Sequence, residues 1–154
     1  MAIIHLSTET DNTGCTVEIF QTTTLSMSPI YTFFLKHMAE LIDNGFAYPA
    51  SSWEDQYCEA VYAEQDGKVI GHIVYSTEYV KKQGNLWITL SAVDNGARGK
   101  GIYTLLHSHF EKVAKDYGCW AISSHVHKNN KVRLASAEKV GMKPVFHFMA
   151  KKLT

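Results

Sequence analysis

The sequence predicts a single α+β domain built on a mixed, mostly antiparallel sheet. Two strand-like runs are joined by the pair Asp66-Gly67, a strong signal for a β-hairpin and therefore for antiparallel strands. Between residues 86 and 126 a strand, a helix and a further strand follow one another, and such a crossover requires parallel strands. With 154 residues and no repeat or second boundary, the chain (1–154) is expected to form one domain.

The composition argues against several classes of protein. The 15 acidic and 15 basic residues cancel, whereas proteins that mainly bind nucleic acid or anionic membranes select for net positive charge. Three widely spaced cysteines, Cys15, Cys58 and Cys119, signal neither a disulfide framework nor a zinc motif. No run of 18 apolar residues is present. We therefore expect a cytoplasmic protein that binds neither nucleic acid nor membrane.

Four segments are distinguished before the hairpin. Apolar and polar residues alternate in Ile3–Leu6 and Cys15–Phe20, which predicts at least one strand. The pair Ser28-Pro29 is typical of a helix start, and apolar residues recur at helical spacing to residue 42. Phe46–Asp55 is expected to be a loop or a short helix. This segment has two interpretations. Its aromatic residues and carboxylates suit an amine pocket, but the aromatic residues could instead fill the core beside the helix.

The rest of the chain alternates strand-like and helical patterns bounded by turn residues. The predicted strands are Tyr57–Glu64, Lys68–Val80, Leu86–Val93, Trp120–Val126 and one or two strands within Met142–Leu153. The predicted helices are Ile102–Tyr117 and a helix that is capped by Asn129-Asn130 and runs to about Val140.

The most informative stretch is Arg98-Gly99-Lys100-Gly101-Ile102-Tyr103, which joins a predicted strand to a predicted helix. Two glycines allow the backbone to approach a ligand closely, and the free N–H groups and dipole of a helix start favour an anion there. The cations Arg98 and Lys100 add positive charge at the same point. This pattern predicts a binding site for a phosphate or pyrophosphate group, although an ordinary strand–turn–helix connection has the same elements.

The spacing of these residues excludes two common phosphate-binding motifs. A Walker loop needs Lys and Ser or Thr directly after its last glycine, but Gly101 is followed by Ile102 and Tyr103. A dinucleotide fingerprint needs a third glycine near Thr104 and a carboxylate about 20 residues on, and neither is present.

The pattern Arg98-x-x-Gly101-x-Tyr103 resembles instead the acetyl-CoA signature Arg/Gln-x-x-Gly-x-Gly/Ala of the GNAT superfamily of N-acetyltransferases. Two further motifs are similar to that family in the same register. Ile122-x-Ser124-x-Val126-x-x-x-Asn130 matches the family's fifth strand and the asparagine after it, and Gly141-Met142 matches Gly-Phe at the end of the next helix. The resemblance covers most of residues 57–150.

This resemblance implies a three-layer fold with helices on both faces of the sheet and a central pair of parallel strands that splay apart. Acetyl-CoA is the implied co-substrate. Its pantetheine arm would lie between the splayed strands against the backbone of Ala92 and Val93, its pyrophosphate on the N–H groups from Arg98 to Tyr103, and Asn130 would contribute to binding. The acceptor would be a primary amine of a small molecule or a protein, which attacks the thioester directly. A homodimer is also consistent with the family.

The sequence departs from the family pattern at three places. The tyrosine that commonly protonates the departing thiolate falls at Ala137, which has no proton to give. The strand carboxylate that often serves as the base falls near Thr89 or Ser91, and neither is acidic. Tyr103 occupies a position where a small residue is usual. It either tilts clear of the phosphates, supplies a hydroxyl to the site, or crowds the cofactor.

Replacement catalytic groups can be named from the sequence. His125 and His127, two residues apart at the end of a predicted strand, are expected to share one face near the thioester, and either is a candidate base. Each could also be an ordinary solvated or core histidine, and no third ligand at short spacing supports a metal site. Glu78, on the neighbouring strand, is a further candidate.

These observations support an acetyl-CoA-dependent N-acetyltransferase as the first hypothesis. The alternative is a catalytically weak or inactive module of the same fold that holds CoA or a partner protein, because the usual acid and base are both missing. Losing general acid or base catalysis costs about 10²- to 10⁴-fold in rate, so positioning alone can sustain a slow enzyme.

Overall fold

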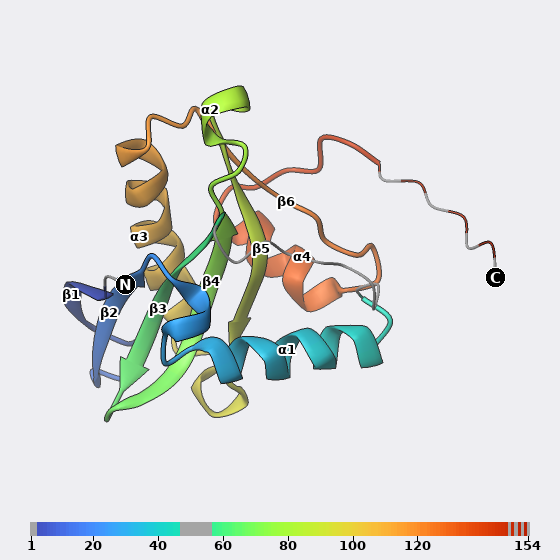
Figure 1. Ribbon diagram of the computed structural model, residues 1–154. Coiled ribbons are helices and arrows are strands. Elements are labelled where there is room, and N and C mark those ends of the chain that lie inside the picture. Colours follow the sequence, from blue (N-terminus) through green and yellow to red (C-terminus); the bar gives the residue numbers. More distant parts are fainter. Residues whose placement is uncertain (1–2, 47–56, 148, 150, 152, 154) are drawn as a thin grey trace.

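The computed structural model describes residues 3–46, 57–147, 149, 151 and 153, and these residues contain one six-stranded sheet (Figure 1). The strands lie side by side in chain order, antiparallel except for the last pair, which is parallel. They are β1 (Ile3–Thr10), β2 (Thr16–Thr22), β3 (Cys58–Gln65), β4 (Lys68–Ser76), β5 (Asn85–Val93) and β6 (Ala121–Ser124). The predicted mixed, mostly antiparallel sheet is confirmed.

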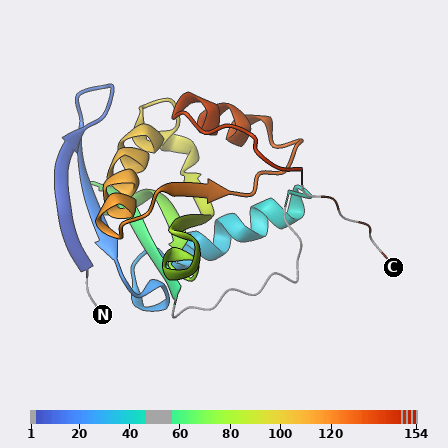
Figure 2. The same cartoon turned by 90° about the horizontal axis from the view of Figure 1, so that it is seen from above.

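Helices cover both faces of this sheet. Helix α1 crosses one face, while α3 and α4 lie on the other (Figure 2). None of the described helices is long and apolar enough to span a membrane. The helices are α1 (Tyr31–Asp43), α2 (Val80–Gln83), α3 (Ile102–Asp116) and α4 (Lys131–Lys139), with 3-10 turns η1 (Leu25–Met27) and η3 (Asn95–Ala97).

Each face of the sheet has its own apolar core. On the α3 face, Phe110 of α3 packs in a cluster with Tyr75 of β4, and both side chains are fully buried. On the α1 face, Phe34 of α1 belongs to a second cluster with Tyr62 of β3. Burying each such side chain stabilises the fold by roughly 1.5–3 kcal/mol. The two cores hold the helices, and therefore the loops between them, in fixed positions on the sheet.

A β-bulge interrupts β5 at its centre. Val74 of β4 lies opposite Leu90, but the next residue of β4, Tyr75, lies opposite Ile88, so Thr89 is the extra residue. The bulge reverses the faces of the strand. Ile88 belongs to the core on the α3 face, whereas Leu90 belongs to the core on the α1 face.

The predicted start of α1 and the predicted end of β4 are both wrong. Helix α1 begins at Tyr31 rather than near Ser28, because the Ser28 hydroxyl donates to the Leu25 carbonyl (2.7 Å) and closes η1 instead of capping α1. The predicted strand Lys68–Val80 ends at Ser76, since the chain then turns into α2.

The C-terminal half of the crossover is also shorter than predicted. Strand β6 ends at Ser124 rather than Val126, because its partner β5 bulges just after the last paired residues. Among the described residues beyond Gly141 no strand forms, which contradicts the predicted strands in Met142–Leu153. Val145 and Phe146 are exposed there. An apolar segment becomes a strand only where it has a neighbour to pair with. Most of the predicted loop Phe46–Asp55 lies outside the described residues.

Gly71 allows β4 and α3 to pack closely against each other. A Cβ at this position would lie 3.2 Å from the Ala92 carbonyl oxygen and 3.2 Å from Leu106 Cδ1. We expect Gly71→Ala to lower the free energy of unfolding by about 1–3 kcal/mol because of this overpacking. Chemical denaturation would measure the change.

Gly96→Ala is the matched control, because Gly96 also has no left-handed backbone and its Cβ would meet only the Asp94 carboxylate at 3.9 Å. Equal denaturation midpoints for the two variants would contradict the proposed close packing at Gly71.

Candidate functional site

The second half of β5 has an open edge. Parallel pairing with β6 runs only from Asn85 opposite Ala121 to Ile88 opposite Ser124, and it stops where the bulge begins. Beyond that point, within the described part of the chain, β5 is paired with β4 alone. The predicted separation of the two parallel strands is therefore present, and the bulge is its physical cause.

The ladder with β4 determines which backbone groups face this edge. The Asp94 N–H donates to the Ile70 carbonyl (2.8 Å). Because residues of an antiparallel strand alternate between its two sides, Ala92 also points its N–H toward β4. The N–H groups of Ser91 and Val93 then point to the open edge. Of the two residues predicted to hold the ligand's arm, this geometry favours Val93.

The open edge leads directly into a cradle for an anion. Gly99 and Gly101 have positive φ angles of 76° and 81°, which only glycine adopts readily. No side chain of the described residues caps α3, and the first N–H bonded back into the helix is that of Leu105, to the Gly101 carbonyl at 3.2 Å. The N–H groups before Leu105 are the free donors of a helix start.

The β1–β2 turn fixes the position of this cradle. The Asn12 N–H donates to the Lys100 carbonyl (2.9 Å), and a Cβ at Gly101 would lie 2.9 Å from the Asn12 side chain. The turn itself is held by Asp11, whose carboxylate accepts hydrogen bonds from Thr13 and from other neighbours. Those hydrogen bonds hold the pKa of Asp11 well below its usual range. The cradle therefore rests on a rigid support.

The two predicted cations lie beside the cradle. Arg98 is exposed, and its Nε donates to the Val93 carbonyl at 3.1 Å, which spans the loop from its end back to β5. Lys100 is half-buried. The remaining guanidinium donors of Arg98 and the Lys100 ammonium make the surroundings of the loop positively charged, which favours an anion there.

Tyr103 does not point out over the loop. Its ring lies under the guanidinium of Arg133, with 5.2 Å from Arg133 Cζ to the ring centroid, and 5.8 Å from the His107 ring. Its neighbour Ile102 is buried in the core on the α3 face. The structure thus places the Tyr103 side chain between the first turns of α3 and α4.

Three polar atoms are buried together at this place. Tyr103 OH, Ser91 Oγ and one terminal nitrogen of Arg133 have no hydrogen-bond partner within the described part of the chain. Arg133, by its charge and as a hydrogen-bonding neighbour, and Ser91, as a hydrogen-bonding neighbour alone, still lower the pKa of the Tyr103 hydroxyl, although neither meets the full geometry of a hydrogen bond. Unpaired buried polar groups are costly, typically about 1–3 kcal/mol each. Such a cluster beside an open strand edge fits a polar ligand that pairs with these atoms.

Asn130 and Arg133 come from the start of α4. The Asn130 side-chain oxygen caps the helix by accepting from the Arg133 N–H at 3.2 Å. Asn130 was predicted to bind the ligand, and the cap occupies its oxygen, so its amide N–H groups are the ones offered. Sequence reasoning missed Arg133, for which the available signal was a cation one turn after a capping asparagine.

The two candidate histidines lie beyond β6 in exposed positions, so the predicted shared strand face is not observed. The His125 ring packs edge-on against Trp87, with centroids 4.6 Å apart. The His127 ring is 5.6 Å from Phe46, and its Nδ1 accepts from the Asn129 N–H at 3.1 Å. Within the described residues, no group of three or more His, Cys, Asp or Glu is placed to hold a metal ion.

Glu78 lies in an exposed turn after β4 and not on a strand as predicted. Its N–H donates to the Ser76 hydroxyl at 3.2 Å. Because Ser76 lies opposite Trp87 while Gly71 lies opposite Val93, Glu78 follows the end of β4 that is farthest from the cradle. The structure therefore separates Glu78 from the open half of β5.

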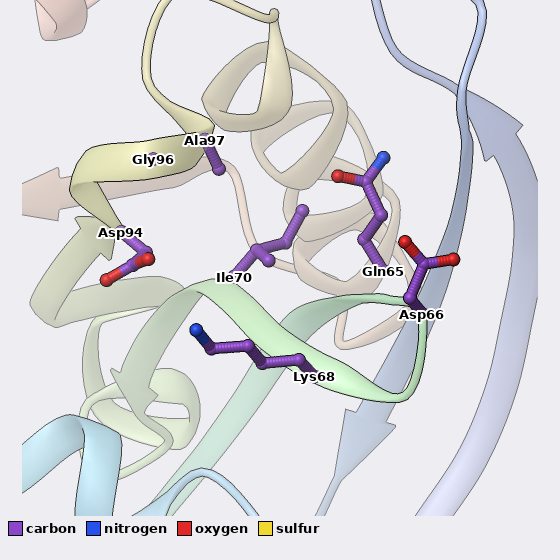
Figure 3. A pocket seen from close by; sticks show the side chains of 7 residues that line it. All are labelled: Gln65, Asp66, Lys68, Ile70, Asp94, Gly96 and Ala97. Atoms are coloured by element: carbon purple, nitrogen blue, oxygen red, sulfur yellow. The ribbon is translucent and has the colours of Figure 1, made fainter.

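A surface hollow of about 320 Å³ lies between the β3–β4 turn and η3 (Figure 3). Its charged side chains are two carboxylates and one ammonium group, an unfavourable balance for a pyrophosphate. The charge of this hollow therefore differs from that of the cradle, and we do not assign the pyrophosphate to it. The lining residues are Gln65, Asp66, Lys68, Ile70, Asp94, Gly96 and Ala97.

On the α1 face of the sheet, β4 carries a buried histidine beside the open half of β5, and sequence reasoning missed it. His72 lies opposite Ala92 in the ladder and is fully buried. Its ring is 5.1 Å from Phe33 and 6.0 Å from His37, both on α1. Burial, together with the charge of His37, lowers the pKa of His72 to about 3. His72 is therefore neutral at physiological pH.

An open strand edge that leads into a glycine loop at a helix start is suited to an extended, phosphate-bearing ligand. The sequence profile of the Acetyltransferase (GNAT) family matches residues 19–142. The chain belongs to this family of N-acetyltransferases, whose co-substrate is acetyl-CoA. The resemblance found in the sequence is confirmed.

Solved structures of acetyltransferases share the fold. An aminoglycoside N-acetyltransferase in complex with CoA aligns with a TM-score of 0.65 and 15% identity, over 88% of this chain and 98% of that one. A ribosomal-protein-alanine N-acetyltransferase from Brucella melitensis biovar Abortus gives 0.67 and 16%, over 90% and 99%. An IAA acetyltransferase from Bacillus cereus gives 0.59 and 23%, over 81% and 75%. No curated protein matches the chain in sequence.

The buried His72 predicts a loss of stability in acid. Its pKa is about 3 in the folded state and about 6.5 when unfolded, so the unfolded chain binds one more proton between these values. The free energy of unfolding is unaffected by protonation of His72 above about pH 6.5. Below that pH it falls by at most about 1.4 kcal/mol per pH unit because of this residue. His72→Leu should flatten the dependence of unfolding free energy on pH in this window.

His147→Leu serves as the control, because His147 is exposed in the C-terminal segment. Urea denaturation at a series of pH values gives the two slopes. An unchanged slope in His72→Leu would show that His72 is not buried in its neutral form.

Proposed function

We propose that this protein transfers the acetyl group of acetyl-CoA to a primary amine of a small molecule or a protein, with the open half of β5 and the adjoining cradle as its cofactor site. The observation that supports this most strongly is that the open half of β5 continues directly into the cradle. Parallel pairing stops at Ile88, the unpaired edge continues to Val93, and the glycine cradle follows within six residues. An extended chain with a pyrophosphate at one end matches this order of groups.

The backbone contributes most of the binding in this proposal. The N–H groups of Ser91 and Val93 face the open edge and are suited to the amide-rich pantetheine arm, as an added strand would be. The N–H groups from Gly99 to Tyr103, with Arg98 and Lys100, hold the pyrophosphate. Acetyl-CoA supplies the activated thioester. The chain orients it and polarises its carbonyl by an N–H at the open edge.

The amine must lose a proton before it can attack the carbonyl carbon. For a lysine-like amine this costs roughly 4 to 5 kcal/mol at neutral pH. His125 and His127 are the proposed bases, acting directly or through water, because the chain that carries them continues from Ser124, where β6 parts from β5. Glu78 is less suited, because it lies beyond the other end of the ladder.

The class of acceptor is the finer part of the proposal. Similar folds are found in an aminoglycoside N-acetyltransferase and a ribosomal-protein-alanine N-acetyltransferase, so this architecture serves both small and protein amines. The residues that we predict to line the amine pocket lie mostly within 47–56, outside the described chain. A primary amine is common to both acceptor classes and is what the chemistry of direct transfer requires.

Calorimetric titration with acetyl-CoA tests the cofactor site. We expect micromolar binding by the wild-type protein and a large loss in Arg98→Glu, because the reversed charge repels the pyrophosphate. Lys115→Glu makes the same change of charge at an exposed position near the other end of α3 and should bind normally. Equal affinities in all three proteins would contradict the assignment of the cradle.

Release of CoA across a panel of amines tests turnover. If His125 or His127 is the base, His125→Ala or His127→Ala should lower kcat by about 10²-fold or more and remove the acidic limb of its pH profile. Acetyl-CoA affinity should not change. Saturable binding without turnover of any amine would favour a module that holds CoA without transferring its acetyl group.

A further inference from the structure

The transfer reaction needs a proton at a second place. When the amine nitrogen bonds to the carbonyl carbon and the carbon–sulfur bond breaks, the sulfur leaves as a thiolate that must be protonated or stabilised. Ala137, which occupies the position of the usual tyrosine, is 8% exposed and has no proton to give. Another donor is therefore needed from a neighbouring element.

The face of α4 that carries Ala137 is occupied by Tyr103. Arg133 and Ala137 are four residues apart and so lie one turn apart on the same face of the helix. The Arg133 guanidinium lies over the Tyr103 ring at 5.2 Å. The ring of Tyr103, which comes from α3, therefore stands against the side of α4 from which a tyrosine at position 137 would project.

The hydroxyl of Tyr103 is directed into the interior at the open half of β5. This hydroxyl is buried and has no hydrogen-bond partner within the described chain. The same holds for the Ser91 hydroxyl, which lowers the pKa of Tyr103. Ser91 also points its backbone N–H to the open edge, where the thioester is proposed to lie. The Tyr103 hydroxyl and the thioester site thus meet at the same residue of β5.

We propose that Tyr103 is the general acid of this enzyme, donating its hydroxyl proton to the departing thiolate in place of the absent tyrosine at position 137. This inference rests on the proposed function. In the step, the carbon–nitrogen bond forms, the carbon–sulfur bond breaks, and the phenol proton passes to sulfur. The tyrosinate then regains a proton from solvent, and the proton lost by the amine goes to its base.

The surroundings of Tyr103 suit this role. Burial raises its pKa, and the effect of burial exceeds the opposite effects of Arg133 and Ser91, so the phenol keeps its proton at neutral pH. The Arg133 guanidinium stabilises the negative charge that the phenol acquires on donation. His107, the other ring beside Tyr103, has a pKa lowered by burial and adds little positive charge at neutral pH.

Tyr103→Phe tests the role of the hydroxyl, because it keeps the ring under Arg133 and removes only the proton donor. Tyr117→Phe is the matched control. It removes a phenol from the residue that follows the other end of α3, where Tyr117 OH donates to Glu59 at 2.6 Å. We expect Tyr103→Phe to retain saturable acetyl-CoA binding while kcat falls by about 10²-fold or more. Tyr117→Phe should retain its kcat.

A second measurement does not depend on turnover. The thiol pKa of bound CoA can be followed by the ultraviolet absorbance of its thiolate. A hydroxyl that donates to the thiolate lowers this pKa, so bound CoA should titrate at a lower pH in the wild type and in Tyr117→Phe than in Tyr103→Phe.

The outcomes separate the two proposals. If the wild-type protein neither binds CoA nor releases it from acetyl-CoA, the proposed function and the role of Tyr103 both fall. If it does both and Tyr103→Phe matches it in kcat and in thiol pKa, only the role of Tyr103 falls. Tighter acetyl-CoA binding by Tyr103→Ala than by the wild type would overturn the inference too, because the ring would then be obstructing the site.

Discussion

The β-bulge at Thr89 is the constraint on which the rest of the site depends. By inserting one residue, it ends the pairing of β5 with β6 after Ile88 and leaves the next residues paired on one side only. It also turns Leu90 and Ala92 toward α1, and Ser91 and Val93 toward α3. A regular strand would have placed these side chains on the opposite faces and would have allowed β6 to cover the edge.

The cradle depends on close packing around it. Gly71 allows α3 to approach the sheet, and the β1–β2 turn holds the loop through Asn12. Together these contacts fix the first turn of α3 relative to the open edge of β5. The backbone N–H groups that face the proposed ligand site are thus fixed in advance, and such preorganisation lowers the entropy lost when a ligand binds.

The buried polar cluster of Tyr103, Ser91 and Arg133 is unfavourable in the protein alone. Three buried polar atoms without a hydrogen-bond partner among the described residues are unusual for an ordinary core, where apolar replacements of similar shape are usually at least as stable. Their position, between the starts of two helices and the open edge, is the basis for the role in binding and proton transfer that we propose for them. In this proposal the two departures from the family pattern compensate each other, because the phenol missing at Ala137 is supplied by Tyr103.

The sequence by itself determined the order of the main elements from β3 to α4 apart from the short α2, the parallel pair and the glycine loop before α3, because each rests on local periodicity or on residues whose backbone freedom is special. It also identified the family through three motifs in register. Only the tertiary structure decided which way β5 faces after Thr89, since a bulge depends on the partner strand and leaves no mark in the alternation. The tertiary structure likewise decided that His125 and His127 follow a strand instead of sharing its face, and that Glu78 lies beyond the far end of β4. It also brought Tyr103 of α3 into contact with Arg133 of α4. Contacts between side chains distant in sequence are set by packing, which local patterns do not encode.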